Sequence, residues 1–191
     1  MSNKYKIVDQ QGLHYLTLTT VGWIDLFTRQ IYRDILIDSL KYCIANKGLS
    51  VHAYIIMPNH LHLIVSTQAP FLLSNVLRDF KAHTGRSIFQ LLQDKNQIES
   101  RRDWLLHVCN YQALGRRDKQ KYQLWQTDNH PIVLVSAKVI LQKLNYIHQN
   151  PVRAGFVEQA SDWLYSSAGF YETGKGLLPV EVLDSAYDLR Q

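Results

Sequence analysis

The sequence has few cysteines and no long apolar run. Its 191 residues include only Cys43 and Cys109, whose positions form no paired spacing, so neither a disulfide framework nor a cysteine zinc site is indicated. We expect both thiols to be reduced. The apolar stretches are too short and too interrupted to span a bilayer, and the amino terminus lacks the apolar run of a signal peptide. These absences predict a cytoplasmic protein with no membrane partner.

Carboxylates are missing from two segments that are otherwise rich in candidate functional side chains. Neither residues 49–67 nor residues 136–155 contain Asp or Glu. A metal-dependent hydrolase of small phosphoesters, which uses water as its nucleophile, would be expected to add a carboxylate ligand there. The absence therefore counts against this class of enzyme.

The composition is that of a folded protein with a modest excess of positive charge. Hydrophobic residues make up 46% of the chain, which fits a globule with a real core. The formal net charge of +5 and the pI near 9.2 favour a phosphate-bearing partner, although such values are common among cytosolic proteins. We expect one domain over residues 1–191, with a core at about 14–157 and an extension at about 158–191 whose aromatic rings pack on it.

Hydrophobic periodicity predicts an α+β fold. The expected strands are residues 14–21, 49–56 and 61–66, and the expected helices are 30–46, 71–93 with Gly85 as a candidate break, and a later one from about 136. Residues 94–120 are charged and poorly periodic, which fits a loop, an inserted helix or a segment ordered by DNA. Residues 124–126 and 132–135 are strand-like or irregular. This order predicts a central antiparallel sheet with helices packed on it.

Two histidines occur one residue apart in the strand that follows Met57-Pro-Asn59. Alternate side chains of a strand point to the same face, so His60 and His62 emerge together while Leu61 and Leu63 face the core. Two neutral imidazoles on a rigid strand can share one divalent cation. The alternative is a pair of histidines on a solvated face, and the spacing alone does not decide between them.

A second group of candidate residues lies near the end of the later helix, which Ser136 caps and which Pro151 should end. Tyr146 and Asn150, at i and i+4, share one helix face, whereas His148 points about 200° around the axis from Tyr146. If this helix packs beside the histidine strand, two imidazoles and one amide oxygen would hold a cation next to the Tyr146 oxygen. The alternative for Tyr146 alone is a partly buried helix tyrosine.

These residue types suit phosphodiester chemistry. A cation held by three protein groups keeps open positions for a phosphate oxygen and polarises the phosphorus. A tyrosine can form a covalent intermediate that preserves the energy of the broken phosphodiester, so a later hydroxyl can reverse the attack. Two imidazoles and an amide would also suit zinc, nickel or copper, but phosphoryl chemistry favours a hard, exchangeable cation such as Mg²⁺ or Mn²⁺.

The histidine strand and the tyrosine helix together resemble segments of a known family. Met57-Pro-Asn-His-Leu-His-Leu-Ile64 resembles the histidine-hydrophobic-histidine motif of the HUH single-strand transposases, which use one catalytic tyrosine (Y1). Tyr146–Val157, followed by Asp162–Ser167, is similar to the carboxy-terminal signature of the REP-associated tyrosine transposases. The order of elements is similar over about residues 14 to 171. The resemblance implies the ferredoxin-like, RNA-recognition-like fold of the HUH nucleases.

The resemblance also implies an activity. It predicts a Mg²⁺- or Mn²⁺-dependent endonuclease and strand transferase that acts on single-stranded DNA, joins tyrosine to the 5′ phosphate and recognises REP-like hairpin DNA. His60 and His62 would bind the metal, Tyr146 would attack, and Asn150 would complete the coordination. Insertion-sequence relatives typically carry glutamine at the last position, one methylene longer than Asn150, and His148 is the rival ligand. The protein would act as a monomer or as a homodimer that exchanges tyrosine helices.

Positive charge is concentrated in the middle of the chain and on the helix after the histidine strand. The candidate DNA-binding residues are Arg78, Lys81, Arg86, Arg116, Arg117, Lys119 and Arg153. Trp104, Tyr111, Tyr122 and Trp125 are interleaved with these cations, and unpaired bases can stack on aromatic rings while cations follow the backbone. A solvated charged face is the alternative interpretation of each cluster.

Two alternatives to the strand transferase stay open at this point. The first is a protein of the same fold that binds hairpin DNA by charge and stacking but is catalytically silent or regulatory. An intact tyrosine and an intact histidine pair argue against it. The second is the phosphoester hydrolase, which the missing carboxylates disfavour.

Overall fold

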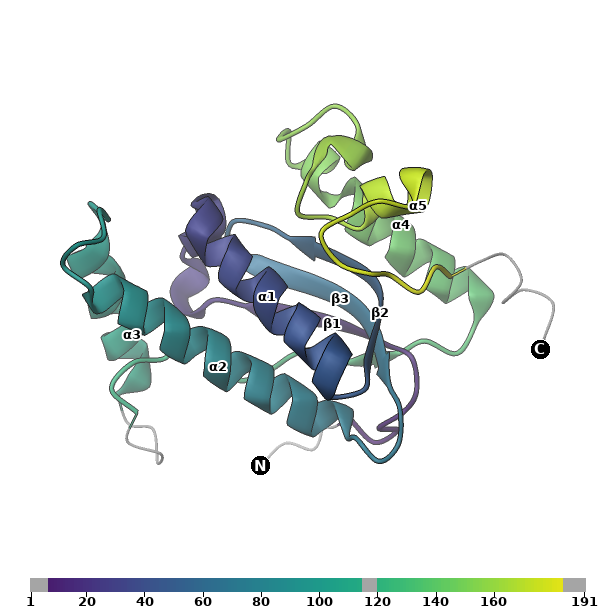
Figure 1. The fold of residues 1–191 in the computed structure, drawn as a ribbon, viewed down its shortest axis with the longest axis horizontal. Coiled ribbons are helices and arrows are strands. Elements are labelled where there is room, and N and C mark those ends of the chain that lie inside the picture. The colour runs from purple at the N-terminus through teal and green to yellow at the C-terminus, as the bar shows by residue number, and fades with distance from the viewer. Residues whose placement is uncertain (1–6, 115–119, 184–191) are drawn as a thin grey trace.

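The computed structural model describes residues 7–114 and 120–183, which form a four-stranded antiparallel sheet with helices on both faces (Figure 1). The strands are β1 (His14–Thr19), β2 (Leu49–Ile56), β3 (His60–Thr67) and β4 (Ile132–Val133), in the order β2-β3-β1-β4. The helices are α1 (Gln30–Asn46), α2 (Leu73–Gln93), α3 (Arg102–Ala113), α4 (Ala137–Arg153) and α5 (Ala168–Thr173), with short 3₁₀ turns at Val21–Trp23, Leu26–Thr28 and Ala160–Asp162. The predicted α+β fold class is confirmed.

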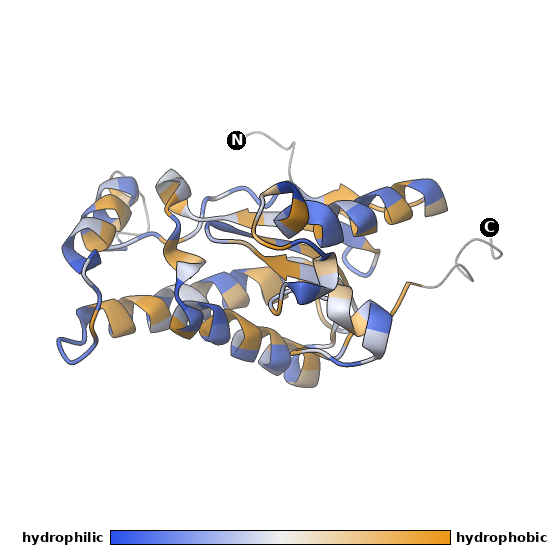
Figure 2. Ribbon diagram, turned by 90° about the horizontal axis from the view of Figure 1, so that it is seen from above, coloured by the Kyte–Doolittle hydropathy of each residue, from blue (hydrophilic) through white to orange (hydrophobic). Residues whose placement is uncertain are grey.

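The sheet separates two hydrophobic cores. One core joins alternate residues of the strands, such as Leu16 and Leu61, to buried residues of α1 and α2. The other joins Tyr15, Ile55 and Ile64 to buried residues of α4. Figure 2 shows apolar residues on the central strands and helices that alternate between apolar and polar around their axes, as expected of helices with one buried face.

A bulge in β2 sets which residues face each core. The register between β2 and β3 shifts between Val51 and Ala53, so Val51 packs in the α1–α2 core whereas Ala53 and Ile55 pack under α4. A bulge inserts one residue into the pairing and bends its strand. The residue at the bulge is His52, whose Nδ1 donates to Glu181 O over 3.0 Å and whose Nε2 lies 3.0 Å from Ser66 Oγ.

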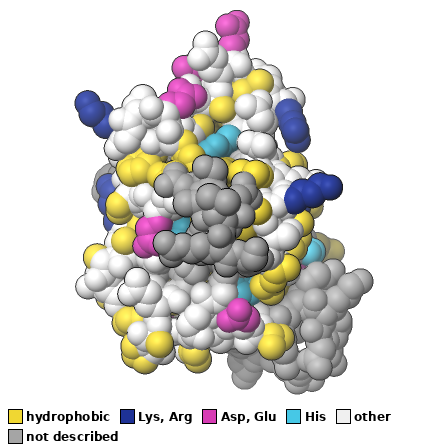
Figure 3. Space-filling model, turned by 90° about the vertical axis from the view of Figure 1, so that its right-hand side faces the viewer, with side chains coloured by type: hydrophobic (Ala, Val, Ile, Leu, Met, Phe, Trp, Pro, Cys, Tyr) yellow, Lys and Arg dark blue, Asp and Glu magenta, His cyan; other side chains and the backbone are white. Residues whose placement is uncertain are grey.

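The carboxy-terminal part of the described chain packs along the β2 edge. Tyr165 accepts a hydrogen bond from Ile56 N at its carbonyl, and Glu181 N donates to Val51 O. Tyr165 is buried, and its hydroxyl donates to Asp34 Oδ1 over 2.7 Å. On this side of the molecule the coloured Lys and Arg side chains stand apart from one another (Figure 3). None of the helices within residues 7–114 and 120–183 is both long and apolar enough to cross a membrane.

The observed bounds of α1 and β2 are those predicted from the sequence. The structure differs from the expected start of α2 at residue 71 and from a break at Gly85. Helix α2 starts at Leu73, leaves Leu72 exposed and continues through Gly85, which packs close to Leu124. Residues 94–120 contain the inserted helix α3.

Helix α4 continues past Pro151 to Arg153, where we expected it to end. Proline removes one ladder hydrogen bond, but Pro151 is buried and the last turn keeps its hydrogen bond from Ala154 N to Asn150 O. The predicted cap is present, because Ser136 Oγ accepts a hydrogen bond from Val139 N.

Packing of α4 on the sheet predicts a large effect of truncating Ile147, which is fully buried in the α4 core. Ile147→Ala should lower the free energy of unfolding by about 2–5 kcal/mol, because it removes buried apolar contacts and leaves a cavity. Urea unfolding followed by tryptophan fluorescence measures the change. Leu141→Ala on the exposed side of the same helix is the control, and an equal loss in both variants would contradict this packing.

Candidate active site

His60 and His62 lie at the start of β3, on the face that α4 covers. Their ring centroids are 4.6 Å apart. Antiparallel pairing places Thr19 of β1 opposite His60 and Thr17 opposite His62, so the neighbouring strand fixes the side chains that surround each ring. The solvated-face alternative does not hold for His62, which is 4% exposed.

The hydrogen bonds of His60 leave one ring nitrogen available for a metal ion. Its Nδ1 lies 2.6 Å from Asn59 Oδ1, and Asn59 Nδ2 donates to the carbonyl of Trp23 over 3.4 Å. Because a carbonyl oxygen only accepts, we assign the proton to His60 Nδ1. Nε2 of this tautomer carries the lone pair that a cation needs.

Two hydroxyl groups bind the Nδ1 atom of His62. Its Nδ1 lies 2.9 Å from Tyr15 Oη and 3.0 Å from Thr17 Oγ1. Its Nε2 is buried and has no hydrogen-bond partner among the described residues. A buried polar atom without a partner is costly, so a ligand at Nε2 would satisfy it, with Nδ1 donating to one of the hydroxyls.

Burial keeps both imidazoles neutral. Loss of solvation lowers the pKa of His62 to about 3, with a further contribution from His60, and lowers the pKa of His60 to about 4. Neutral imidazole is the form that binds metal ions. Burial also raises the pKa of Tyr15 to about 12, so its hydroxyl stays protonated beside His62.

Tyr146 of α4 lies beside this pair within the same chain. Its ring centroid is 5.4 Å from that of His62 and 6.3 Å from that of Tyr15. The side chain is 38% exposed, so a substrate can reach it. Two cations flank the ring, since Lys143 Nζ and Arg153 Cζ lie 5.9 Å and 5.8 Å from its centroid.

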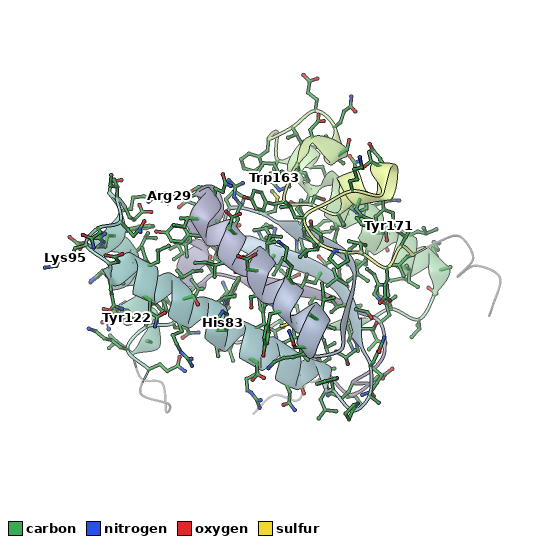
Figure 4. The ribbon with its side chains drawn as sticks, viewed as in Figure 1. Arg29, His83, Lys95, Tyr122, Trp163 and Tyr171 are labelled. Atoms are coloured by element: carbon green, nitrogen blue, oxygen red, sulfur yellow. The ribbon has the colours of Figure 1, made fainter. Side chains whose placement is uncertain are left out.

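The two candidates for the third ligand lie on different faces of α4. His148 is turned towards the carboxy-terminal segment, where its Nε2 lies 2.9 Å from Ser167 Oγ and its ring packs on Tyr171 of α5 with centroids 4.9 Å apart. Figure 4 labels Tyr171. Asn150 lies one turn beyond Tyr146 on the same helix face and is half-buried.

These residues fit a divalent cation. Two neutral imidazoles, one of them with a buried and unpartnered nitrogen, form the donor set. Within the ranges that the structure describes, no group of three or more His, Cys, Asp or Glu side chains is arranged to hold a metal ion. A cation held by His60 and His62 would therefore depend on an amide oxygen, DNA or water for its other ligands.

The predicted DNA-binding cations fall into three groups. Arg78, Lys81 and Arg86 line one groove beside α2. Arg153 lies next to Tyr146. Arg116, Arg117 and Lys119 lie outside the described residues.

Sequence reasoning missed four residues that surround the site. Tyr15, Thr17 and Asn59 hold the imidazoles, and Lys143 lies over the Tyr15 ring with its Nζ 4.6 Å from the centroid. Lys143 could have been found, because it precedes Tyr146 by three residues and so shares its helix face. Tyr15 and Thr17 depend on the pairing of β1 with β3, which the sequence does not give.

Burial of His148 predicts a pH-dependent stability. Loss of solvation lowers its pKa to about 4, whereas in the unfolded chain it takes up a proton near its ordinary pKa of about 6.5. Between these values the unfolded state binds more protons, so the free energy of unfolding falls as the pH falls from about 6.5 to 4. His148→Gln should reduce this slope in urea unfolding without added metal.

The matched control is His83→Gln on α2, an exposed histidine that Figure 4 labels. It measures the effect of replacing a histidine that is exposed in the folded protein. His52, His60 and His62 contribute in the same direction because burial also lowers their pKa values. A slope that stays the same in His148→Gln would show that His148 is protonated as easily in the folded protein as in the unfolded chain.

Comparison with known proteins gives one matching family model and two solved structures. Residues 16–106 match the family model described as "Transposase IS200 like". The structure of a REP-associated tyrosine transposase bound to a REP hairpin superimposes with a TM-score of 0.62 at 20% identity, over 96% of this chain and 94% of that one. A proposed transposase from Deinococcus radiodurans R1 gives a TM-score of 0.44 at 18% identity, over 77% of this chain and 95% of that one.

A comparison with curated proteins gave no match. The family match covers the histidine strand, and the fold match extends over the tyrosine helix. The comparisons therefore support the sequence resemblance: residues 16–106 are similar to the IS200-like transposases, and the chain has the fold of a REP-associated tyrosine transposase.

Proposed function

We propose that this protein is a metal-dependent endonuclease and strand transferase of single-stranded DNA, with Tyr146 as its nucleophile. The observation that carries the proposal is the position of Tyr146, whose ring centroid lies 5.4 Å from that of His62 in the same chain. The resemblance to IS200-like transposases implies that the activity depends on a divalent metal ion. The candidate residues present here, two neutral imidazoles and a tyrosine, suit that chemistry.

In the proposed reaction the Tyr146 hydroxyl oxygen forms a bond to phosphorus while the bond from phosphorus to the 3′ oxygen breaks. The phenol gives up its proton and the departing 3′ oxygen takes one up, which leaves a 5′-phosphotyrosine and a free 3′ hydroxyl. Attack by a 3′ hydroxyl on the phosphotyrosine reverses these steps and joins strands. Each step exchanges one phosphate ester bond for another, so the reaction needs no external energy source.

His60 and His62 would hold Mg²⁺ or Mn²⁺, with Asn150 in preference to His148 as a further ligand. The bound ion would polarise the phosphate and orient it for in-line attack. His148 is the weaker candidate because its Nε2 is hydrogen-bonded to Ser167. Lys143 and Arg153 would stabilise negative charge on the phenol oxygen and the phosphate as the reaction proceeds.

We further propose that hairpin DNA is the substrate, because the structure of similar fold is bound to a REP hairpin. Residues 1–191 would act as one domain, and a monomer would suffice since Tyr146 lies beside the histidines of its own chain. The cytoplasm, where chromosomal DNA is accessible, is the proposed place of action. A catalytically silent hairpin-binding protein is the competing function, and adduct formation distinguishes the two.

Tyr146→Phe should abolish covalent attachment to single-stranded DNA and leave DNA affinity within about twofold, because it removes one oxygen from the reaction centre. The assay incubates protein with labelled DNA from the flanks of its own gene and Mn²⁺, then detects an adduct that survives denaturant. Tyr42→Phe, an exposed tyrosine on α1, is the control and should form the adduct normally. An adduct that persists in Tyr146→Phe would move the nucleophile to another tyrosine, with the exposed Tyr111 as the next candidate.

The His60→Ala, His62→Ala double variant should lose Mn²⁺ binding and DNA cleavage together, because both imidazoles are proposed ligands. Titration followed by the electron paramagnetic resonance signal of free Mn²⁺ measures binding without reference to activity. The matched control is His83→Ala. Unchanged Mn²⁺ affinity in the double variant would mean that the metal site is elsewhere.

A further inference from the structure

A basic groove of about 770 Å³ lies between α2 and residues 120–129, and residues 125–129 in turn lie beside β1. Four cationic residues line it, namely Arg78, Lys81, Arg86 and Lys121, and no carboxylate is among its lining residues. On the side of the molecule in Figure 3, by contrast, Lys and Arg side chains are scattered. The groove therefore favours a ligand that carries negative charge along its length.

One end of the groove presents aromatic surface. Tyr122 and Phe89 pack with their ring centroids 5.0 Å apart, and Lys121 Nζ lies 5.1 Å from the Tyr122 centroid. Both rings are half-buried, so part of each remains accessible. Figure 4 shows Tyr122 beside α2, at the end of the molecule near α3. An aromatic face next to cations suits an unpaired base and its phosphate.

Trp125 also lines the groove but belongs to the core, contrary to its expected stacking role. It is 4% exposed, its Nε1 donates to Thr84 Oγ1, and its ring packs on Phe27 and Phe80. Base stacking in the groove is therefore assigned to the Tyr122 end.

The groove shares a wall with the candidate active site. Lys81 Nζ donates to Gln126 O over 2.6 Å and to Asn129 Oδ1 over 2.8 Å. Asn129 O accepts from Thr17 N over 2.9 Å, and Thr17 Oγ1 lies 3.0 Å from His62 Nδ1. Lys81 thus holds the segment that separates the groove from the imidazoles, and a strand that crosses this segment reaches the site.

We propose that this groove binds an unpaired stretch of the DNA strand, with phosphates near Arg78, Arg86 and Lys121 and a base on Tyr122, and leads that strand to Tyr146. In a paired duplex the base faces are stacked on one another and hidden, so the aromatic end selects unpaired DNA. The inference rests on the proposed function in taking DNA as the partner. Binding in the groove does not itself require cleavage.

The test measures fluorescence anisotropy of a labelled oligothymidylate, in a Tyr146→Phe background without divalent metal. Arg86→Gln should weaken binding several-fold and reduce the salt dependence of log K by about 0.7, the value for one phosphate contact on a single strand. Tyr122→Leu should weaken binding about tenfold, in the range measured for loss of one stacked base. Lys175→Gln, an exposed cation beyond α5, should bind normally.

Two further measurements separate a stacking site from a general effect of charge or folding. Tyr122→Phe keeps the ring and should retain the affinity that Tyr122→Leu loses. A blunt hairpin without unpaired flanks should bind the Tyr122→Leu variant as tightly as it binds the protein that keeps Tyr122. Normal oligothymidylate binding by Arg86→Gln and Tyr122→Leu, or an equal loss on the blunt hairpin, would overturn the inference.

The outcome is independent of the adduct assay. If the unsubstituted protein forms the tyrosine adduct but the groove variants bind oligothymidylate normally, the groove inference fails and the proposed function stands. If no adduct forms but the groove variants lose binding, the proposed function fails and the groove inference stands.

Discussion

The packing of α4 on β2 and β3 is the interaction on which the candidate active site depends. Ile140, Leu144 and Ile147 form the buried stripe of this helix. Because side chains at helical spacing have fixed relative directions, anchoring that stripe also fixes Tyr146 at the rim of the interface, beside His62. Hydrophobic packing of the helix thus brings the Tyr146 ring next to the His62 ring.

Burial of the imidazoles has an energetic consequence that suits metal binding. It lowers their pKa values well below neutrality, to about 4 for His60 and about 3 for His62, so protons compete weakly for the ring nitrogens. The neighbouring amide of Asn59 and the hydroxyls of Tyr15 and Thr17 bind the Nδ1 atoms and leave Nε2 for a ligand. Such outer hydrogen bonds orient ligands in metal sites generally. The site is therefore organised by neutral groups, which suits the absence of carboxylates from both segments of sequence.

Hydrophobic periodicity in the sequence predicted the helices and strands. The tertiary contacts of their side chains depend on long-range pairing and could not be predicted in this way. Alternation and helical periodicity were sufficient for α1, β2 and the opposite directions of His62 and Leu63, because each depends on neighbouring residues alone. The convergence of Tyr146 with the histidines was a conditional prediction, since sequence cannot place one element beside another. Trp125 shows the limit clearly: its aromatic character suggested base stacking, but tertiary packing buries it. Pro151 shows a second limit, because burial of its ring outweighs one lost ladder hydrogen bond.

The most direct test of the account mixes two inactive proteins. Tyr146→Phe retains the histidines, and the His60→Ala, His62→Ala double variant retains the tyrosine, so a mixture forms an adduct only if tyrosine and histidines act across two chains. Because Tyr146 lies beside the histidines of its own chain, we predict no adduct from the mixture at any ratio, while the unsubstituted protein forms one. Recovery of the adduct on mixing would contradict a site built within one chain.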